Sequence, residues 1–161
     1  MDEIILEKNN AADDLNGRFL TFYIDDTVYG IDLLHVIEII QVPPITHIPH
    51  VPNYIKGIIN LRGKIAPIIS VRLKFNQQEI PYDEKTCIIV VVINDMHVGL
   101  IVDSISEVAN IDSDELAAPP QFGSDLSNQY LGSIANVDGR VILNIDCNKF
   151  FESDLGIISS Y

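Results

Sequence analysis

Histidine is the residue type in this chain best suited to binding a metal ion, and His47 and His50 lie close together in sequence. On a helix their spacing would bring both imidazoles to one face, but Pro49 and Pro52 exclude a helix there. No glutamate follows His47 as it does in zinc hydrolases. We therefore expect a solvent-facing, proline-rich loop without a metal. A metal-dependent hydrolase that uses His47, His50 and His97 is kept as an alternative.

The other residues that could do chemistry are two cysteines, Cys87 and Cys147. Cys87 opens the apolar run of residues 87–93, where burial would raise the pKa of its thiol and make it inert. The chain has no CxxC pair, nucleophile elbow, phosphate loop or dinucleotide-binding loop. We predict no enzyme activity and no cofactor, and two free thiols suited to the reducing cytosol.

Composition narrows the classes of partner. The chain has a formal net charge of −13, which repels nucleic acid and anionic lipid alike. Its longest apolar run is far shorter than the ~20 residues of a membrane-spanning helix. The first residues are acidic where a secretory signal would be basic. These observations favour a cytoplasmic protein with protein or small-molecule partners, no nucleic acid and no membrane insertion.

The elements that must position any site are arranged as an internal repeat. Residues 19–39 resemble residues 88–108, and residues 54–65 resemble residues 130–141, in the same order along the chain. The identities in the two pairs of segments are Ile24 with Ile93, Asp26 with Asp95, Gly30 with Gly99, Glu38 with Glu107, Tyr54 with Tyr130, Ile58 with Ile134, Asn60 with Asn136 and Gly63 with Gly139. Two copies of one small unit are therefore predicted.

Each copy is predicted to be rich in β-strands. Asp25-Asp26 and Asn94-Asp95 separate apolar runs, and these residue types tolerate the positive φ of a two-residue hairpin turn. Residues 33–40 fit either a short helix or a strand, and a short helix is expected after Asp146. We expect a mainly β protein built as a pair of small barrels, leaving open whether strands are exchanged between the copies. Residues 1–16 and 154–161 are expected to be flexible tails.

The repeat also helps to separate structural from functional residues. Four repeated glycines, Gly30, Gly63, Gly99 and Gly139, are interpreted as positions that need positive φ. Arg62, in contrast, differs in charge from its counterpart in the second copy, which is Asp138. We expect Arg62 to bind a carboxylate on a partner and predict that Arg62→Asp abolishes this coupling while leaving the melting temperature within a few degrees.

The motif Gly57-Ile58-Ile59-Asn60-Leu61-Arg62-Gly63 resembles the signature of the CheW family. Five further segments match the family in order: residues 29–32, 36–39, 67–72, 98–103 and 119–122, the last before Tyr130-Leu131. The resemblance implies two five-stranded SH3-like β-barrels packed together, with a few short helices. It places them in a single domain of residues 17–153, with repeat units of about 18–75 and 87–151.

Members of this family are adaptors of bacterial chemotaxis. The resemblance implies that the chain couples the cytoplasmic tip of chemoreceptors to the regulatory domain of the histidine kinase CheA, in arrays at the membrane. Carried over by position, the receptor-binding residues would be Val36, Glu38, Gly57, Arg62 and Cys87. Within the same class, a CheA regulatory domain or a fragment of a CheV adaptor is an alternative.

For the kinase or for ring closure, the resemblance assigns Phe122. The chain departs from other members at Ala117, where some carry arginine, and at Cys87, where valine is common. The first departure bears on the ring contact, and the second is a swap of similar volume.

Overall fold

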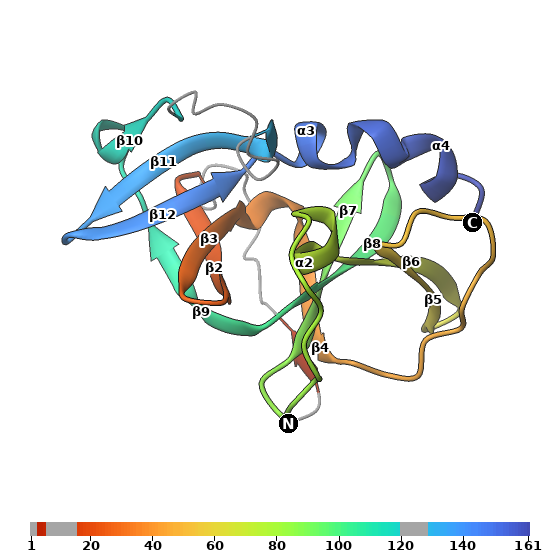
Figure 1. Ribbon diagram of the computed structural model, residues 1–161. Coiled ribbons are helices and arrows are strands. Elements are labelled where there is room, and N and C mark those ends of the chain that lie inside the picture. The colour runs from red at the N-terminus through yellow and green to blue at the C-terminus, as the bar shows by residue number, and fades with distance from the viewer. Residues whose placement is uncertain (1–2, 6–15, 120–128) are drawn as a thin grey trace.

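The computed structural model describes residues 3–5, 16–119 and 129–161, and Figure 1 shows its strands in two groups joined near α2. Sheet A has the strand order β1-β4-β7-β8-β6-β5, and sheet B has the order β10-β11-β12-β3-β2-β9. The strands of sheet A are β1 (Glu3–Ile5), β4 (Val36–Gln41), β7 (Cys87–Ile93), β8 (Met96–Val102), β6 (Lys64–Ser70) and β5 (Ile55–Leu61). Those of sheet B are β10 (Leu116–Ala117), β11 (Leu131–Val137), β12 (Arg140–Ile145), β3 (Thr27–Asp32), β2 (Arg18–Ile24) and β9 (Ser104–Asn110).

The two copies of the repeat exchange hairpins. The β7–β8 hairpin of the second copy lies inside sheet A, and the β2–β3 hairpin of the first copy lies inside sheet B. Each inserted hairpin pairs with its host on both sides. The pairing is antiparallel on one side, β7 with β4 and β2 with β9, and parallel on the other, β8 with β6 and β3 with β12. Without β1 and β10, the two sheets have the same order of equivalent strands. The mainly β fold of two similar units is therefore confirmed, and the open question of strand exchange is answered.

Short helices follow the strands. Asp32 caps the 3-10 turn η1 (Leu33–His35), after which β4 begins, so residues 33–40 contain both of the expected alternatives. Asp146 caps the short helix expected after it, with its carboxylate accepting from the backbone of Asn148 and Lys149. The remaining elements are α2 (Val71–Lys74), η2 (Ser113–Glu115), α3 (Cys147–Phe151), η4 (Glu152–Asp154) and α4 (Leu155–Ile158).

The hairpin turns form as their residue types predict. Asp25, Asn94 and Asp95 have positive φ between paired strands. Gly63 and Gly139 also have positive φ, at turns that follow Arg62 and Asp138.

Gly30 and Gly99 are required for a different reason than expected, because neither has positive φ. Each lies in the parallel strand pair of its sheet, under a side chain of the neighbouring strand. A Cβ on Gly99 would come within 2.6 Å of Ile68 Cδ1, and one on Gly30 within 2.3 Å of Asn144 Oδ1. Close packing across the parallel pair, rather than backbone conformation, requires glycine at both positions.

Both expected tails contain ordered structure. Residues 3–5 form β1, whose backbone pairs antiparallel with β4 from Glu38 to Ile40. At the other end, Asp154 and Ile158 are each 1% exposed, and Figure 1 shows α3 and α4 running along one side of sheet A. Residues 154–158, expected to belong to a flexible tail, include α4, and Ile158 belongs to the largest hydrophobic cluster.

The interior is shared between the sheets. The largest hydrophobic cluster draws side chains from both, including Phe22 and Ile31 of sheet B and Ile89 and Leu100 of sheet A. A smaller cluster lies within each sheet alone. The shared cluster holds the sheets as one packed unit and leaves a groove along their junction.

Candidate functional site

The junction of the two sheets is hollowed into a mainly apolar groove of roughly 400 Å³. Sheet A supplies Ile39 and Cys87, and sheet B supplies Tyr23 and Ile105. We call this recess the inter-sheet groove; its full lining is Tyr23, Ile39, Ile40, Gln41, Glu84, Lys85, Thr86, Cys87, Ser104 and Ile105. An apolar trough with a few polar groups at its rim suits the side of an amphipathic helix better than it suits a reaction.

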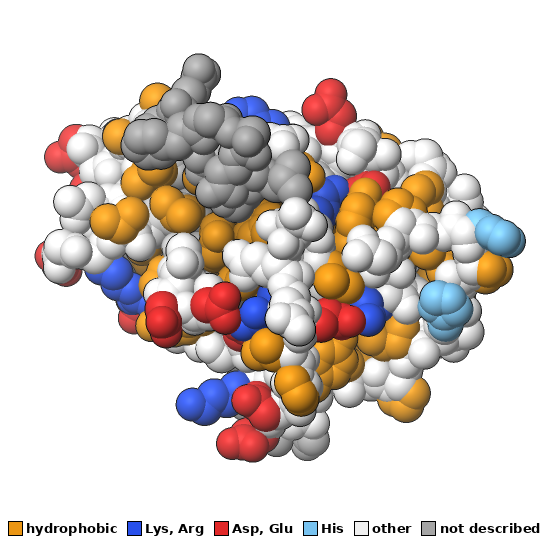
Figure 2. All heavy atoms as spheres, in the orientation of Figure 1, with side chains coloured by type: hydrophobic (Ala, Val, Ile, Leu, Met, Phe, Trp, Pro, Cys, Tyr) orange, Lys and Arg blue, Asp and Glu red, His pale blue; other side chains and the backbone are white. Residues whose placement is uncertain are grey.

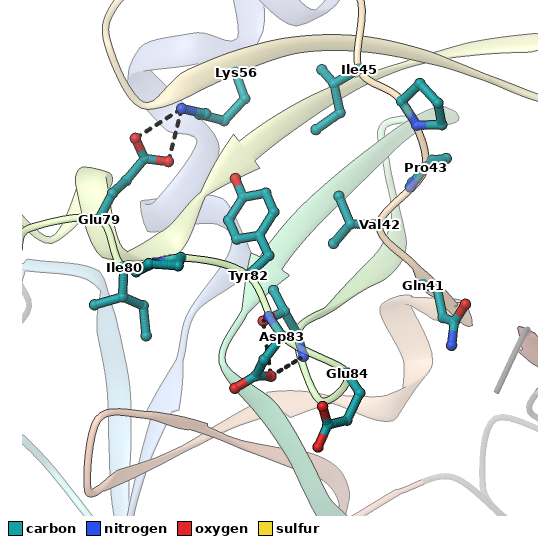
Figure 3. A pocket seen from close by; sticks show the side chains of 13 residues that line it. Gln41, Val42, Pro43, Ile45, Lys56, Glu79, Ile80, Tyr82, Asp83 and Glu84 are labelled. Atoms are coloured by element: carbon teal, nitrogen blue, oxygen red, sulfur yellow. Dashed lines mark hydrogen bonds and ion pairs between the residues drawn. The ribbon is translucent and has the colours of Figure 1, made fainter.

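A larger recess of roughly 1060 Å³, the linker cleft, continues from the groove. It lies between the proline-containing linker after β4 and the loop before β7, and its lining is Gln41, Val42, Pro43, Pro44, Ile45, Lys56, Glu79, Ile80, Pro81, Tyr82, Asp83, Glu84 and Thr86. Figure 3 shows the ring of Tyr82 between the Lys56–Glu79 pair on one side and Val42 and Ile45 on the other.

Charge is distributed unevenly around the linker cleft. Lys56 and Glu79 form an ion pair of 2.8 Å, and Asp83 and Glu84 add acidic groups at the rim. Burial, with Glu79 nearby, raises the pKa of Tyr82, so its hydroxyl stays protonated. Figure 2 shows hydrophobic side chains exposed between charged ones on the lower central part of this face. Such a mixture of apolar floor and polar rim is typical of protein-binding surfaces.

Glu38 and Arg62, two of the residues expected to face a receptor, contact each other instead. Arg62 Nη1 donates to Glu38 Oε1 at 2.6 Å, and Nη2 donates to Oε2 at 2.5 Å. The Glu38 side chain is 2% exposed and that of Arg62 is 55% exposed. The carboxylate that Arg62 meets is therefore internal, and its contact with a receptor stays a prediction.

The other three expected receptor residues have separate places. Cys87 lines the inter-sheet groove, whereas Val36 is fully buried in the shared core. Gly57, in β5, has a φ of +145°, and a Cβ there would lie 2.1 Å from the carbonyl oxygen of Thr46. Thr46 and Ile58 exchange backbone hydrogen bonds of 2.9 Å, so Gly57 lets the linker lie against β5. Both Val36 and Gly57 support the site from inside.

Sequence reasoning missed Tyr23, Ile39 and Ile105 as groove residues. The repeat held a signal for Ile105, because Ile105 is the counterpart of Val36, and the structure leaves Ile105 half-buried. Tyr23 carried no such signal, since it reaches the groove only because hairpins are exchanged between the copies. Phe122, expected at the kinase contact, lies outside the described residues.

The residues considered for chemistry are not assembled into a reaction centre. His47 and His50 are exposed in the linker, as expected. Among the described residues, no three metal-ligating side chains come together. Burial raises the pKa of both thiols, Cys87 and Cys147, to about 12. The part of the chain that the structure describes holds no helix long and apolar enough to cross a membrane.

Comparison with known proteins decides the family, because residues 18–155 match the model of the CheW-like domain. The chain belongs to the CheW family. It is 36% identical over 144 residues to the chemotaxis protein CheW of Klebsiella aerogenes, covering 89% of this chain and 87% of that protein. It is 31% identical over 137 residues to CheW of Helicobacter pylori, covering 85% and 82%.

A solved structure agrees with the CheW assignment. The scaffolding protein CheW of Thermoanaerobacter tengcongensis superimposes with a TM-score of 0.79 at 33% identity, covering 86% of this chain and 94% of the other. The match includes both sheets, so the two-unit fold is that of a CheW scaffold. Family membership makes the chain a scaffold of bacterial chemotaxis and not an enzyme.

Proposed function

We propose that this CheW-family chain couples the cytoplasmic tip of chemoreceptors to the histidine kinase CheA, at the cytoplasmic face of the membrane. The observation that carries the proposal is the inter-sheet groove, an apolar trough with walls from both sheets. Chemoreceptor tips are helical, and a helix that lays its apolar side in a groove binds without any chemistry. In this arrangement Ile39, Cys87 and Ile105 supply apolar contact, and Tyr23 adds an aromatic wall.

A coupling protein needs a second surface for its second partner, and the linker cleft supports that role. It shares Gln41, Glu84 and Thr86 with the groove, so two partners would meet over the same strand ends. We assign the regulatory domain of CheA to the linker cleft, with Phe122 retained as an additional predicted contact. The two partners would then be held side by side by one rigid unit.

Co-sedimentation with a receptor cytoplasmic fragment, with and without CheA, tests the proposal. Ile105→Arg places a charge in the groove and should lower receptor binding at least tenfold. Its matched control is Asn110→Arg, on an exposed position of the same strand outside the groove, which should bind like the wild type. If Ile105→Arg binds the receptor fragment as tightly as Asn110→Arg and the wild type do, the groove is excluded as the receptor site.

A second pair of variants tests the linker cleft separately. Tyr82→Asp should weaken co-sedimentation of CheA while receptor binding is retained, because Tyr82 lines only the linker cleft of the two recesses. Tyr161→Asp, at an exposed tyrosine outside both recesses, is the control. Loss of both partners from Tyr82→Asp alone would show that the recesses do not act as separate surfaces.

A further inference from the structure

Arg72 contacts the residue that links sheet A to sheet B, a turn of sheet B and the loop that forms a wall of the linker cleft. It is the second residue of α2, directly after β6, and its side chain is 10% exposed. Its Nε and Nη2 donate to the two carboxylate oxygens of Asp103 at 2.8 and 2.6 Å. Nη2 also donates to Asp25 Oδ1 at 2.5 Å, and Nη1 donates to the carbonyl oxygen of Gln78 at 3.2 Å.

The three acceptors of Arg72 belong to three different parts of the chain. Asp103 is the single residue between β8 of sheet A and β9 of sheet B. Asp25 lies in the β2–β3 turn of sheet B, and its backbone N–H donates to Asp103 Oδ2 at 2.7 Å. Gln78 lies in the loop before β7. One buried guanidinium therefore ties both sheets and this loop together, and fork-shaped bonds of this kind fix angles as well as distances.

Two of the three acceptors, Asp103 and Gln78, directly precede a lining residue of one of the two recesses. Ser104 of the inter-sheet groove follows Asp103, and the N–H of Asp103 donates to the carbonyl oxygen of Tyr23 at 3.1 Å. Glu79 of the linker cleft follows Gln78 in the same way. Arg72 is thus bonded to residues that directly precede a lining residue of each recess.

The second copy of the repeat lacks a counterpart of this arginine. Ser70 and Asp146 are equivalent caps of α2 and α3, and two positions after each cap stand Arg72 and Asn148. Asn148 is exposed, so sheet B ends in the same kind of helix without such a connection. Arg72 is a feature of the side of the molecule that carries the two recesses.

The geometry points to Arg72 as a positioning residue that holds the sheet B wall of the inter-sheet groove and the loop wall of the linker cleft in one binding-ready arrangement. The inference rests on the proposed function for the identity of the partners. Holding both walls in place before binding removes an ordering cost that each partner would otherwise meet. Loss of Arg72 should therefore weaken the binding of both partners, although Arg72 lines neither recess.

Amide hydrogen exchange and receptor binding of the full chain test this role together. Arg72→Lys keeps the positive charge but cannot donate two parallel hydrogen bonds to Asp103. It should raise amide exchange about tenfold in residues 103–106 and 77–84, while the rest of the chain keeps its protection. Receptor-fragment affinity should fall about tenfold through lost preorganisation. Arg18→Lys, at an exposed arginine of β2, should change neither readout.

Asp25→Asn is a milder second variant, because it weakens only the bond between Arg72 and the β2–β3 turn. It should raise exchange around residues 21–25 and 103–106 but leave residues 77–84 protected. A uniform rise over the whole chain in Arg72→Lys, or unchanged affinity with both walls loosened, would overturn the inference. If the wild type fails to bind the receptor fragment, the proposed function falls, and the exchange pattern still decides whether Arg72 positions the two walls.

Discussion

Glu38 and Arg62 join the two ends of sheet A through a bidentate ion pair. Glu38 lies on β4, near one end of the strand order, and Arg62 follows β5 at the other end. The second copy has a comparable pair, Glu107 with Arg140 at 3.2 Å, but there the arginine stands on the opposite side of the turn glycine. Although Asp138 stands where the first copy has Arg62, Arg140 forms the ion pair with Glu107 that corresponds to the pair of Arg62 with Glu38.

Removal of Arg62 should destabilise the fold, contrary to the expectation from sequence. Arg62→Ala leaves the Glu38 carboxylate buried without this partner, which costs about 3–5 kcal/mol for a fully buried pair. Because the Arg62 side chain is 55% exposed, water screens the pair, and we expect about 1–3 kcal/mol. Urea unfolding of the purified variant measures this loss.

Two controls accompany Arg62→Ala. Arg140→Ala should cost under about 1 kcal/mol, because Glu107 is 60% exposed and can be solvated. The double variant Glu38→Leu with Arg62→Ala should recover much of the loss, since no buried charge is left behind. Equal stability of Arg62→Ala and the wild type would mean that the pair contributes nothing to folding.

Gly57 should be far less tolerant of a side chain than Gly63. In Gly57→Ala the new Cβ meets the Thr46 carbonyl and the positive φ is strained, so we expect a loss of about 3 kcal/mol or more. In Gly63→Ala the Cβ meets nothing within 4 Å, and the positive φ alone costs about 1–2 kcal/mol. Urea unfolding of both variants compares the two costs. Similar losses would indicate that the linker moves away from β5 without penalty.

The buried thiols should make the fold sensitive to alkali. Burial raises the pKa of Cys87 and Cys147 from 9.0 to about 12, so the folded state favours the neutral thiol. Their contribution to stability is complete below pH 9 and is lost as the pH rises from 9 towards 12. Each thiol can contribute a slope of up to about 1.4 kcal/mol per pH unit in that range.

The slope of stability against pH, rather than its absolute value, isolates the thiols. Between pH 9 and 11, the variant Cys87→Ala with Cys147→Ala should lose stability more slowly than the wild type. Other groups titrate equally in both proteins, so they cancel in the comparison. Parallel curves for the two proteins would show that the thiols titrate alike in the folded and unfolded chain.

Local features of this fold could be predicted from the sequence. The hairpin turns at Asp25 and at Asn94-Asp95, and the helix capped by Asp146, depend on residues a few positions apart. Their geometry follows from side-chain type and backbone preference alone. The repeat likewise predicted two similar units, because duplication leaves a direct trace in the sequence.

Features that depend on distant pairing could not be predicted in this way. The same strand pattern allows each hairpin to pair within its own copy or with the other copy, so the observed exchange cannot be deduced from it. The partner of Arg62 depends on how sheet A brings its two ends together, so its charge reversal was interpreted as a sign of an external carboxylate. Tyr23 lines the groove only because of this exchange, so its place could not be predicted from the sequence either.

The end of the chain, expected to be a flexible tail, is held by a buried charge cluster. The Lys74 ammonium pairs with Asp154, and the Tyr54 hydroxyl donates to the same carboxylate at 2.5 Å. The Lys74 Nζ also lies 4.8, 5.2 and 4.9 Å from the ring centres of Tyr54, Tyr130 and Phe150. Burial lowers the pKa of Lys74, while its pairing with Asp154 opposes that shift.

Asp154→Ala should therefore destabilise the whole fold and not only its last helix. It leaves a lysine of 1% exposed side chain without its carboxylate, for which we expect a loss of about 3–5 kcal/mol. Lys74→Met combined with Asp154→Leu should recover most of this loss, because apolar groups of similar size can replace a buried pair. Thermal unfolding of the two variants distinguishes the cases. If Asp154→Ala has the same melting temperature as the wild type, the ion pair contributes nothing to stability, and the prediction of a flexible tail from residue 154 onward would gain support.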